Sequence, residues 1–264
     1  MPIHVHADMR RLTNSEFHQL AYKVMGVIFQ VHNEFSRLID EANFKTIIRQ
    51  RALRAGIPCQ REVEIEVSHG RFRKSYYLDF LFARSLIVEA KTVEALNEVH
   101  HAQTLNYLLL SEMRDGLLVN LRSERVRKRF VSTNLNEEKR REIEFDDSGY
   151  QADSSHDGLL SIVKELLDDW GLFLSAELYL EAIVFLNRIG AQVPSRVAVY
   201  DDGVHVGWHE GGFISNQTMV SVTALVRGQD EMKQQLRKLV RNTSLESVQW
   251  LNLDHHQVTL QTVA

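Results

Sequence analysis

Two carboxylic acids and a lysine lie in adjoining apolar runs of this chain. Asp79 falls within YYLDFLF, and Glu89 and Lys91 fall within LIVEAK. Both runs are typical of buried strands, where a carboxylate is unfavourable unless it is paired or binds a cation. Two such carboxylates close to one lysine therefore indicate a metal site.

The spacing of the second run adds a geometric argument. Side chains alternate between the two faces of a strand, so Glu89 and Lys91 should point to one face and Ala90 to the other. An acid and an ammonium group would then share one small site. This combination suits hydrolysis of a phosphodiester, because carboxylates hold Mg²⁺ or Mn²⁺ while a lysine orients or activates water and offsets developing negative charge.

Gln103 and Tyr107 add a polar pair downstream of this site. The apolar pattern predicts a helix over about residues 94–111, on which positions i and i+4 share one face. Such a pair could brace the site or touch a phosphate, or it could be an ordinary half-buried pair.

These elements together resemble a known superfamily. Asp79-x9-Glu89-x-Lys91 resembles the motif of the PD-(D/E)xK nucleases, and Gln103-Thr-Leu-Asn-Tyr107 is similar to the QxxxY element of their RecB-like branch. The stretch 12–133 resembles the small bacterial GxxExxY proteins, which are themselves predicted nucleases of this superfamily.

The motif that gives the GxxExxY proteins their name is matched in part. In LAYKVMGVIFQVHNEFSRLIDEANF, Glu41 falls on the motif Glu, while Leu38 and Phe44 stand in place of the motif Gly and Tyr. These two departures affect a local turn and one hydroxyl group rather than the expected metal ligands. The neighbouring Asp40 is an alternative to Glu41.

The resemblance implies an α/β fold with a restriction-endonuclease-like core and a Mg²⁺ or Mn²⁺ ion as cofactor. The implied metal ligands are Asp79, Glu89, the Ala90 carbonyl and Glu41, the last bound directly or through water. The implied catalytic residues are Lys91, which would position the attacking water, and Glu41, Gln103 and Tyr107.

Composition narrows the class of protein. Apolar residues make up 44% and charged residues 25% of the 264 positions, which is ordinary for a globular protein. No apolar run approaches the ~20 residues of a membrane span, and the N-terminus lacks the apolar core of a signal peptide. Since Cys59 is the only cysteine, we expect no intrachain disulfide, no disulfide-linked partner and no cysteine zinc cluster. A cytoplasmic protein without a membrane partner is the default expectation.

Charge is distributed unevenly along the chain. The formal net charge is −4, but residues 1–133 carry 20 Lys/Arg and 15 Asp/Glu, against 11 and 20 in residues 134–264. The half that contains the candidate site is the basic one, which favours a polyanionic partner. Nucleic acid is the expected partner, with DNA as the first expectation, but the sequence does not distinguish DNA from RNA. The basic run RSERVRKRF, residues 122–130, could contact phosphates or could guard a solvated edge strand.

Periodicity predicts the order of elements in the first half. Thr13 and Glu16 form a capping-box signature, so a helix should begin near Asn14, and a second helix should run from about Leu38 to Ala55. The expected strands cover about residues 62–67, 73–82, 86–91 and 116–121. The last two should be parallel, because a helix connects them.

Three segments are expected: a nuclease-like domain over 12–133, a charged linker over 134–157 and a second domain over 158–264. Residues 86–121 align without a gap with residues 218–253, so that Ser221 and Thr223 stand where Glu89 and Lys91 do. We interpret the second domain as a degenerate copy of the first that lost the metal site, giving a pseudo-dimer. The oligomeric state stays open, with a monomer that mimics a dimer as one arrangement. Any two β-α-β units of similar patterning could also align in this way.

Two other functions fit the same residues. One is a nucleic-acid-binding or protein-interaction module that keeps the nuclease fold without turnover. The other is a metal-dependent hydrolase that acts on a different substrate. Metal binding at Asp79 and Glu89 would distinguish a nuclease from the binding module. Competition by DNA in an activity assay would distinguish a nuclease from a hydrolase that acts on another substrate.

Overall fold

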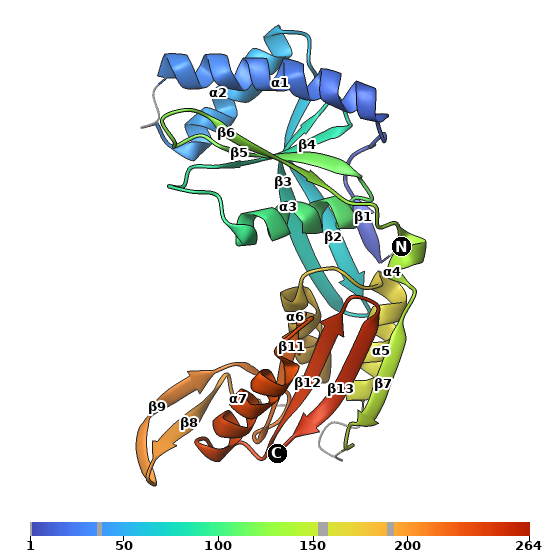
Figure 1. Ribbon diagram of the computed structural model, residues 1–264, viewed down its shortest axis with the longest axis vertical. Coiled ribbons are helices and arrows are strands. Elements are labelled where there is room, and N and C mark those ends of the chain that lie inside the picture. Colours follow the sequence, from blue (N-terminus) through green and yellow to red (C-terminus); the bar gives the residue numbers. More distant parts are fainter. Residues whose placement is uncertain (1, 36–38, 153–157, 189–192) are drawn as a thin grey trace. The chain divides into compact units, whose positions relative to one another are not determined.

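The computed structural model describes residues 2–35, 39–152, 158–188 and 193–264. The chain divides into two compact units (Figure 1). The first unit comprises Met1–Ser68 and Arg73–Asn136, and the second comprises His69–Phe72 and Glu137–Ala264. Both units combine helices with sheets, which agrees with the α/β class expected from the sequence.

The first unit is built on a six-stranded sheet whose strands follow one another in chain order. The strands are β1 (Ile3–Val5), β2 (Cys59–His69), β3 (Phe72–Phe82), β4 (Leu86–Lys91), β5 (Asp115–Asn120) and β6 (Arg127–Ser132). Strands β4 and β5 are parallel, as predicted from the helix between them, whereas β3 is antiparallel to β4 and β6 is antiparallel to β5.

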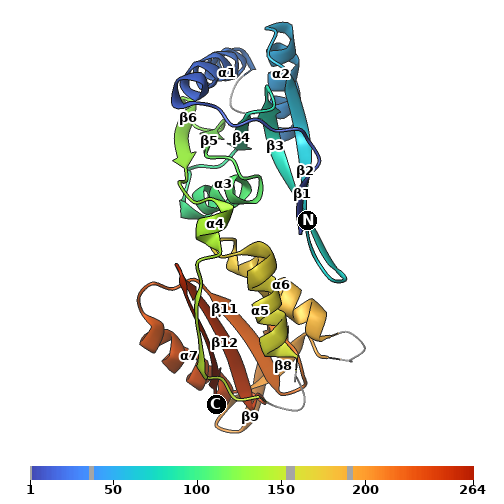
Figure 2. The same cartoon turned by 90° about the vertical axis from the view of Figure 1, so that its right-hand side faces the viewer.

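Three helices cover the two faces of this sheet: α1 (Asn14–Phe35), α2 (Glu41–Arg54) and α3 (Glu98–Leu110). Helices α1 and α2 lie on one face and α3 lies on the other (Figures 1 and 2). The core under α1 and α2 contains fully buried residues from both helices and from the central strands, among them Phe44, Phe80, Val88 and Ala90. Phe44, which stands in place of the motif Tyr in the resemblance described above, is thus a core residue.

The helix boundaries test the predicted capping signals. Helix α1 begins at Asn14 behind the expected capping box, in which the Thr13 amide donates to Glu16 Oε2 and the Glu16 amide donates to Thr13 Oγ1. Helix α3 begins at Glu98 rather than near residue 94, because the Asn97 side chain accepts from the His100 amide and caps it there. Helix α2 begins at Glu41, and Leu38 lies outside the described residues.

The second unit contains a five-stranded sheet and a separate two-stranded hairpin. The sheet has the strand order β10-β11-β12-β13-β7, with β7 (Glu144–Gly149), β10 (Gly212–Phe213), β11 (Thr218–Thr223), β12 (Ser247–Asp254) and β13 (Gln257–Val263). The hairpin is formed by β8 (Arg196–Asp201) and β9 (Val204–Glu210), and the helices are α4 (Glu137–Arg140), α5 (Leu159–Trp170), α6 (Ala176–Asn187) and α7 (Gln229–Arg241).

The segment expected to be a charged linker is structured for much of its length. Strand β7 joins the sheet beside β13, with Phe145 next to Val258. The Arg140 side chain is buried and donates hydrogen bonds to the carbonyls of Trp170 and Leu172. These contacts make it part of the fold, although the charged sequence around it predicts a solvent-exposed residue. The second unit therefore begins at Glu137 rather than near residue 158, and residues 153–157 lie outside the described ranges.

The two units share the geometry of one β-α-β element. In the first unit, Glu89 pairs with Leu118 and Lys91 pairs with Asn120 across the parallel ladder of β4 and β5. In the second, Ser221 pairs with Trp250 and Thr223 pairs with Asn252 across the parallel ladder of β11 and β12. Each of these pairs lies 132 positions after its counterpart, so the ladder register is the same in both units.

An asparagine braces the end of this element in both units. The Asn120 side chain donates to the Val93 carbonyl and accepts from the Val93 amide. The Asn252 side chain makes the same two hydrogen bonds with Leu225. The connection that follows the first parallel strand is therefore held in the same way in both units.

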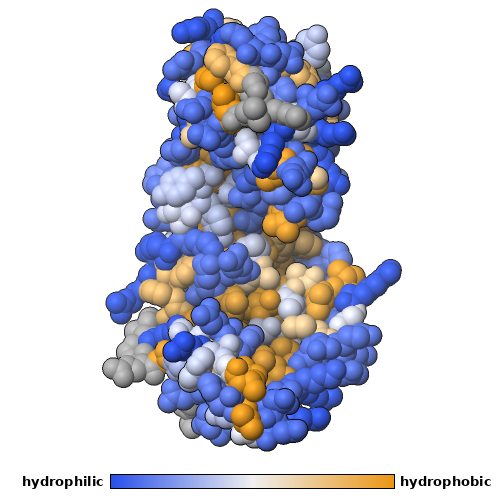
Figure 3. All heavy atoms as spheres, turned by 90° about the vertical axis from the view of Figure 1, so that its left-hand side faces the viewer, coloured by the Kyte–Doolittle hydropathy of each residue, from blue (hydrophilic) through white to orange (hydrophobic). Residues whose placement is uncertain are grey.

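Hydrophilic residues predominate on the face that Figure 3 shows, interrupted by smaller hydrophobic patches. Within the described ranges, no helix has both the length and the apolar character that crossing a bilayer demands.

A pair of substitutions tests the core under α1 and α2. Phe44 is fully buried, so Phe44→Ala should lower the free energy of unfolding of the first unit by about 3–5 kcal/mol. Tyr22 lies on α1 with 83% of its surface exposed, so Tyr22→Ala should change it by less than about 1 kcal/mol.

Urea denaturation with two probes assigns this loss to one unit. All three tryptophans belong to the second unit, so their fluorescence reports on that unit, while circular dichroism reports on both. We expect Phe44→Ala to shift a transition seen by circular dichroism. Equal losses of stability in the two variants would contradict the position of Phe44 in the core.

Candidate active site

Asp79 and Glu89 are brought together where the ladder between β3 and β4 ends. Phe80 pairs with Val88, and the two acids are the next residues along their strands. Phe80, Val88 and Ala90 all belong to the core under α1 and α2. Because side chains alternate along a strand, Asp79 and Glu89 point away from this core and toward the face that α3 covers. They lie at the end of the ladder, where the long Lys45 side chain of α2 also reaches Asp79. The Ala90 amide donates to Asp79 Oδ2 at 2.9 Å and fixes that carboxylate against β4.

Glu89 is the most deeply buried acid of the site. Its side chain is 3% exposed, and its Oε1 accepts from Lys91 Nζ at 2.8 Å. Burial and, next, the negative charge of Asp79 raise the pKa of Glu89 to about 7, although the Lys91 ammonium opposes this rise. The other oxygen, Oε2, is buried and has no hydrogen-bond partner in the part of the chain that the structure describes.

Helix α2 contributes an acid and a second lysine. Lys45 Nζ lies 2.6 Å from Glu41 Oε1 and 2.6 Å from Asp79 Oδ1, and so bridges the helix to β3. Burial of Lys45 by itself would lower its pKa, but the hydrogen bonds and charges of Asp79 and Glu41 outweigh this effect and raise the pKa. Lys45 is therefore a charged ammonium group within the site.

Glu41 is fixed from two sides. Its Oε2 accepts from the Thr92 amide at 3.1 Å and from the Thr92 hydroxyl at 2.9 Å, directly after the end of β4. Burial favours the neutral acid, but the hydrogen bonds from Lys45 and Thr92 outweigh it and lower the pKa of Glu41. Glu41 is thus an ionised carboxylate held at the end of β4.

Gln103 and Tyr107 approach the same site from α3. Gln103 Nε2 donates to Tyr107 Oη at 2.9 Å, as their i and i+4 positions allow. Burial and, next, the charge of Glu89 raise the pKa of Tyr107 to about 12, so the phenol keeps its proton at neutral pH. Tyr107 is itself buried, and it lies on the helix that covers the face toward which Glu89 points (Figure 2).

The donor atoms fit a hard divalent cation. Carboxylate oxygens are the ligands that Mg²⁺ and Mn²⁺ prefer, and the partnerless Oε2 of Glu89 is a buried oxygen that lacks a positive neighbour on one side. Within the described ranges, no group of three or more His, Cys, Asp or Glu side chains is arranged to hold a metal by itself. Lysine ammonium groups pair with the acids instead: Lys45 bridges Glu41 and Asp79, and Lys91 pairs with Glu89.

Lys45 and Thr92 are the site residues that the sequence reasoning missed. Lys45 follows Glu41 by four positions, a spacing that predicts an ion pair on one helix face. This signal is present in the sequence, but nothing there indicates that the same ammonium also reaches Asp79, 34 positions away. Thr92 carries no signal beyond its place directly after Lys91.

A basic edge strand lies beside the site. Strand β6 is at the edge of the sheet, and Arg127, Lys128 and Arg129 on it are exposed. Together with the segment after Lys91 it lines an open depression of about 490 Å³, whose lining residues are Glu94, Ala95, Leu96, Glu98, Asn120, Arg127, Lys128 and Arg129. Arg129 pairs with Glu98, so the depression has a partly compensated but basic rim.

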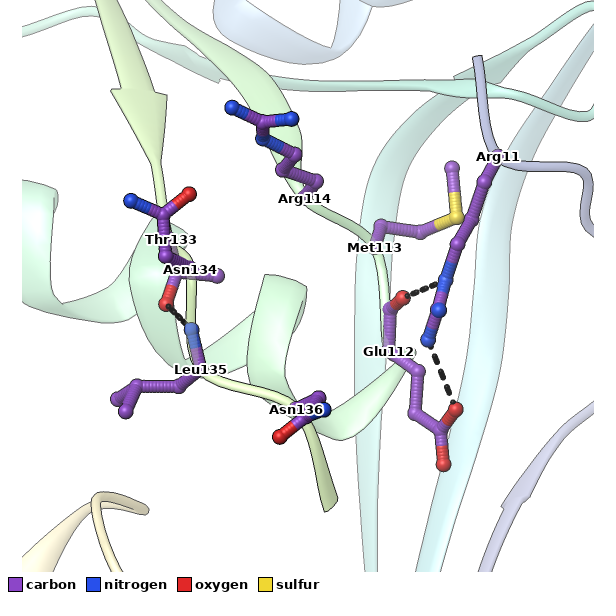
Figure 4. Close-up of a pocket in the computed structure, with 8 residues that line it drawn as sticks. All are labelled: Arg11, Glu112, Met113, Arg114, Thr133, Asn134, Leu135 and Asn136. Carbon is purple, nitrogen blue, oxygen red and sulfur yellow. Dashed lines mark hydrogen bonds and ion pairs between the residues drawn. The ribbon is translucent and has the colours of Figure 1, made fainter. Parts of the chain in front are cut away.

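A second pocket of the first unit is separate from these acids. Figure 4 shows it between the segment after α3 and the end of β6, with a volume of about 240 Å³. Arg11 is one of its basic residues, and its guanidinium donates to the Glu112 carbonyl and pairs with the Glu112 carboxylate. That cation is already paired, and the lining contains none of the residues predicted for the active site.

Comparison with known families supports the expected relationship. Residues 18–131 match the PD-(D/E)XK nuclease superfamily, a stretch that runs from within α1 into β6 and includes the whole candidate site. Neither a curated protein nor a solved structure matches the chain in the corresponding comparisons.

The raised pKa of Glu89 leads to a prediction about stability. Because the folded state holds this proton more tightly than the unfolded chain, ionisation of Glu89 destabilises the fold as the pH rises from about 4.5 to about 7. Glu89→Gln cannot ionise, so its stability relative to wild type should increase over this range, by up to roughly 3 kcal/mol.

Urea denaturation between pH 5 and pH 8 in metal-free buffer measures this difference. Glu94→Gln is the control, since Glu94 is exposed and its replacement should change stability little at any pH. If the stabilities of wild type and Glu89→Gln changed with pH in parallel, Glu89 would not be the acid whose pKa is raised in the folded state.

Proposed function

We propose that the first unit is a metal-dependent nuclease that hydrolyses phosphodiester bonds of nucleic acid. The observation that carries this proposal is the buried Glu89 beside Asp79, paired with Lys91, within a stretch that matches a nuclease superfamily. We also place the unit in the GxxExxY group with a RecB-like QxxxY element, on the positions of Glu41, Gln103 and Tyr107.

A Mg²⁺ or Mn²⁺ ion is the proposed cofactor. Asp79, Glu89 and the Ala90 carbonyl would hold it, with Glu41 bound directly or through water. A divalent ion at this position supplies Lewis acidity and positive charge where a phosphate group carries negative charge. The partnerless Oε2 of Glu89 is the feature of the site that supports this assignment.

Lys91 has the central role among the side chains. Its ammonium group shares one strand face with Glu89 and is held 2.8 Å from that carboxylate, so it can orient a water molecule beside a bound phosphate and offset developing negative charge. Tyr107 keeps its proton, because its pKa lies at about 12, and can therefore donate a hydrogen bond to a phosphate oxygen. Gln103 fixes the orientation of this phenol.

The second unit is proposed to be a degenerate copy of the first. The identical ladder register and the matching braces of Asn120 and Asn252 support this origin. Ser221 and Thr223 take the places of Glu89 and Lys91, so the copy has neither the acid nor the ammonium group. A role in supporting the fold rather than in chemistry follows.

A second candidate function is a binding module that keeps the fold without turnover. Lys45 and Lys91 compensate the three acids without a metal, and this favours a site that is stable in the absence of catalysis. Metal binding at Asp79 and Glu89, together with hydrolysis, separates the two candidates.

Activity of Lys91→Ala tests the nuclease directly. If Lys91 positions the nucleophile, its removal should lower the rate of hydrolysis by about 10²–10⁴-fold, with the fold intact by circular dichroism. Single- and double-stranded DNA and RNA are each incubated with Mg²⁺ or Mn²⁺, and with a chelator.

Ser221→Ala is the matched control, because it alters the corresponding strand of the second unit. It should leave the rate unchanged. Equal rates for wild type and Lys91→Ala, or equal rates with and without divalent ions, would contradict the proposed mechanism.

Strand β6 is expected to contact the phosphate backbone. In the inactive Lys91→Ala background, replacing Arg127 and Lys128 by Ala should weaken DNA binding and reduce the dependence of log K on log salt by about 0.9 for each phosphate that the protein no longer neutralises. Fluorescence anisotropy at several salt concentrations measures both quantities. Arg54→Ala, at the exposed end of α2, is the control. An unchanged salt slope would show that β6 merely guards the sheet edge.

A further inference from the structure

Lys45 occupies a position that a metal ion could otherwise take. Its Nζ lies 2.6 Å from one oxygen of Glu41 and 2.6 Å from one oxygen of Asp79, and its side chain is only 13% exposed. The remaining oxygens of both acids are also engaged. Asp79 Oδ2 accepts from the Ala90 amide, and Glu41 Oε2 accepts from Thr92. The ammonium group therefore fills the cation position between these two carboxylates.

Glu89 presents the opposite situation. One of its oxygens is paired with Lys91, while Oε2 is buried and lacks a partner in the described part of the chain. The positive charge that the protein provides is thus supplied between Glu41 and Asp79 but is incomplete at Glu89.

We propose that Lys45 is a built-in substitute for a second metal ion, so that the site binds one divalent cation, at Asp79 and Glu89, and none between Asp79 and Glu41. This inference rests on the proposed function in that it assumes a divalent ion at the site. It adds the number of bound metal ions, one per site, and a role for Lys45 on α2.

The charges favour this arrangement. With Glu41, Asp79 and Glu89 ionised against Lys45 and Lys91, the site has a net charge of −1. One divalent ion reverses this to +1, whereas a second ion in the same small volume would meet a site that is already positive. Lys45 is also anchored to Glu41 by the i, i+4 geometry of α2, so it keeps its place beside Asp79.

The number of bound ions tests the proposal. Mn²⁺ binding to the full-length protein is followed by electron paramagnetic resonance of the free ion, at constant ionic strength and with circular dichroism to verify the fold. We expect one Mn²⁺ per chain for wild type and two for Lys45→Met, which keeps an unbranched side chain one atom shorter and vacates the position between the acids. Lys45→Gln should also bind two, and it replaces Lys45→Met if that variant does not fold.

Two controls separate the vacated position from a general change in charge. Lys91→Met removes the same charge but leaves Lys45 in place, so it should still bind one ion. Lys45→Met combined with Glu41→Gln removes a ligand of the new position and should return the count to one.

The outcomes distinguish this inference from the proposed function. One ion for both wild type and the Lys45 variants, or two ions for wild type, would overturn the role of Lys45 while leaving a metal-dependent nuclease intact. Absence of Mn²⁺ binding in wild type and in every variant would contradict the metal site itself, and with it the proposed function.

Discussion

The burial of Glu89 beside Asp79 is the constraint on which the rest of the site depends. Two carboxylates in a poorly solvated position repel each other, and each is unfavourable there without a positive partner. Two lysines provide these partners: Lys91 of the same strand lies at hydrogen-bonding distance from Glu89, and Lys45 of α2 lies at hydrogen-bonding distance from Asp79. Helix α2 must consequently pack with its first turn beside the end of β4, and buried residues such as Phe44 hold it there. The core under α1 and α2 thus fixes the helix that provides Glu41 and Lys45.

The second unit shows what the same framework looks like without this constraint. Its ladder has the same register, but the corresponding strand positions carry Ser221 and Thr223. The Thr223 hydroxyl donates to Asn252 and accepts from the indole of Trp250, so neutral polar groups satisfy one another where the first unit places charges. Neutral groups need no counter-ion, which explains why this framework can persist without acids or lysines. The comparison separates the features that the β-α-β element shares in both units, the asparagine brace and the parallel ladder, from the charged residues of the proposed metal site.

The sequence predicts the framework of the first unit well, because its signals are local. The capping box at Thr13, the alternating strands and the apolar runs around Asp79 and Glu89 each depend on neighbouring residues, and the elements appear close to where these signals place them. The sequence does not predict the features that depend on contacts between residues far apart in the chain. The segment 134–157 looks like a solvated linker, yet Arg140 is buried against carbonyls 30 and 32 positions away and β7 joins a sheet. Lys45 was missed for the same reason, since its contact with Asp79 spans 34 positions.

Asp79 and Glu89 are proposed to hold a divalent cation. Anomalous scattering from a crystal of the protein soaked in Mn²⁺ tests it most directly, because the ion is located independently of any activity. We expect a single strong peak beside Glu89 Oε2 and Asp79, with Lys45 still between Asp79 and Glu41. The absence of a peak there at millimolar Mn²⁺, or an ion bound only at other residues, would contradict the account.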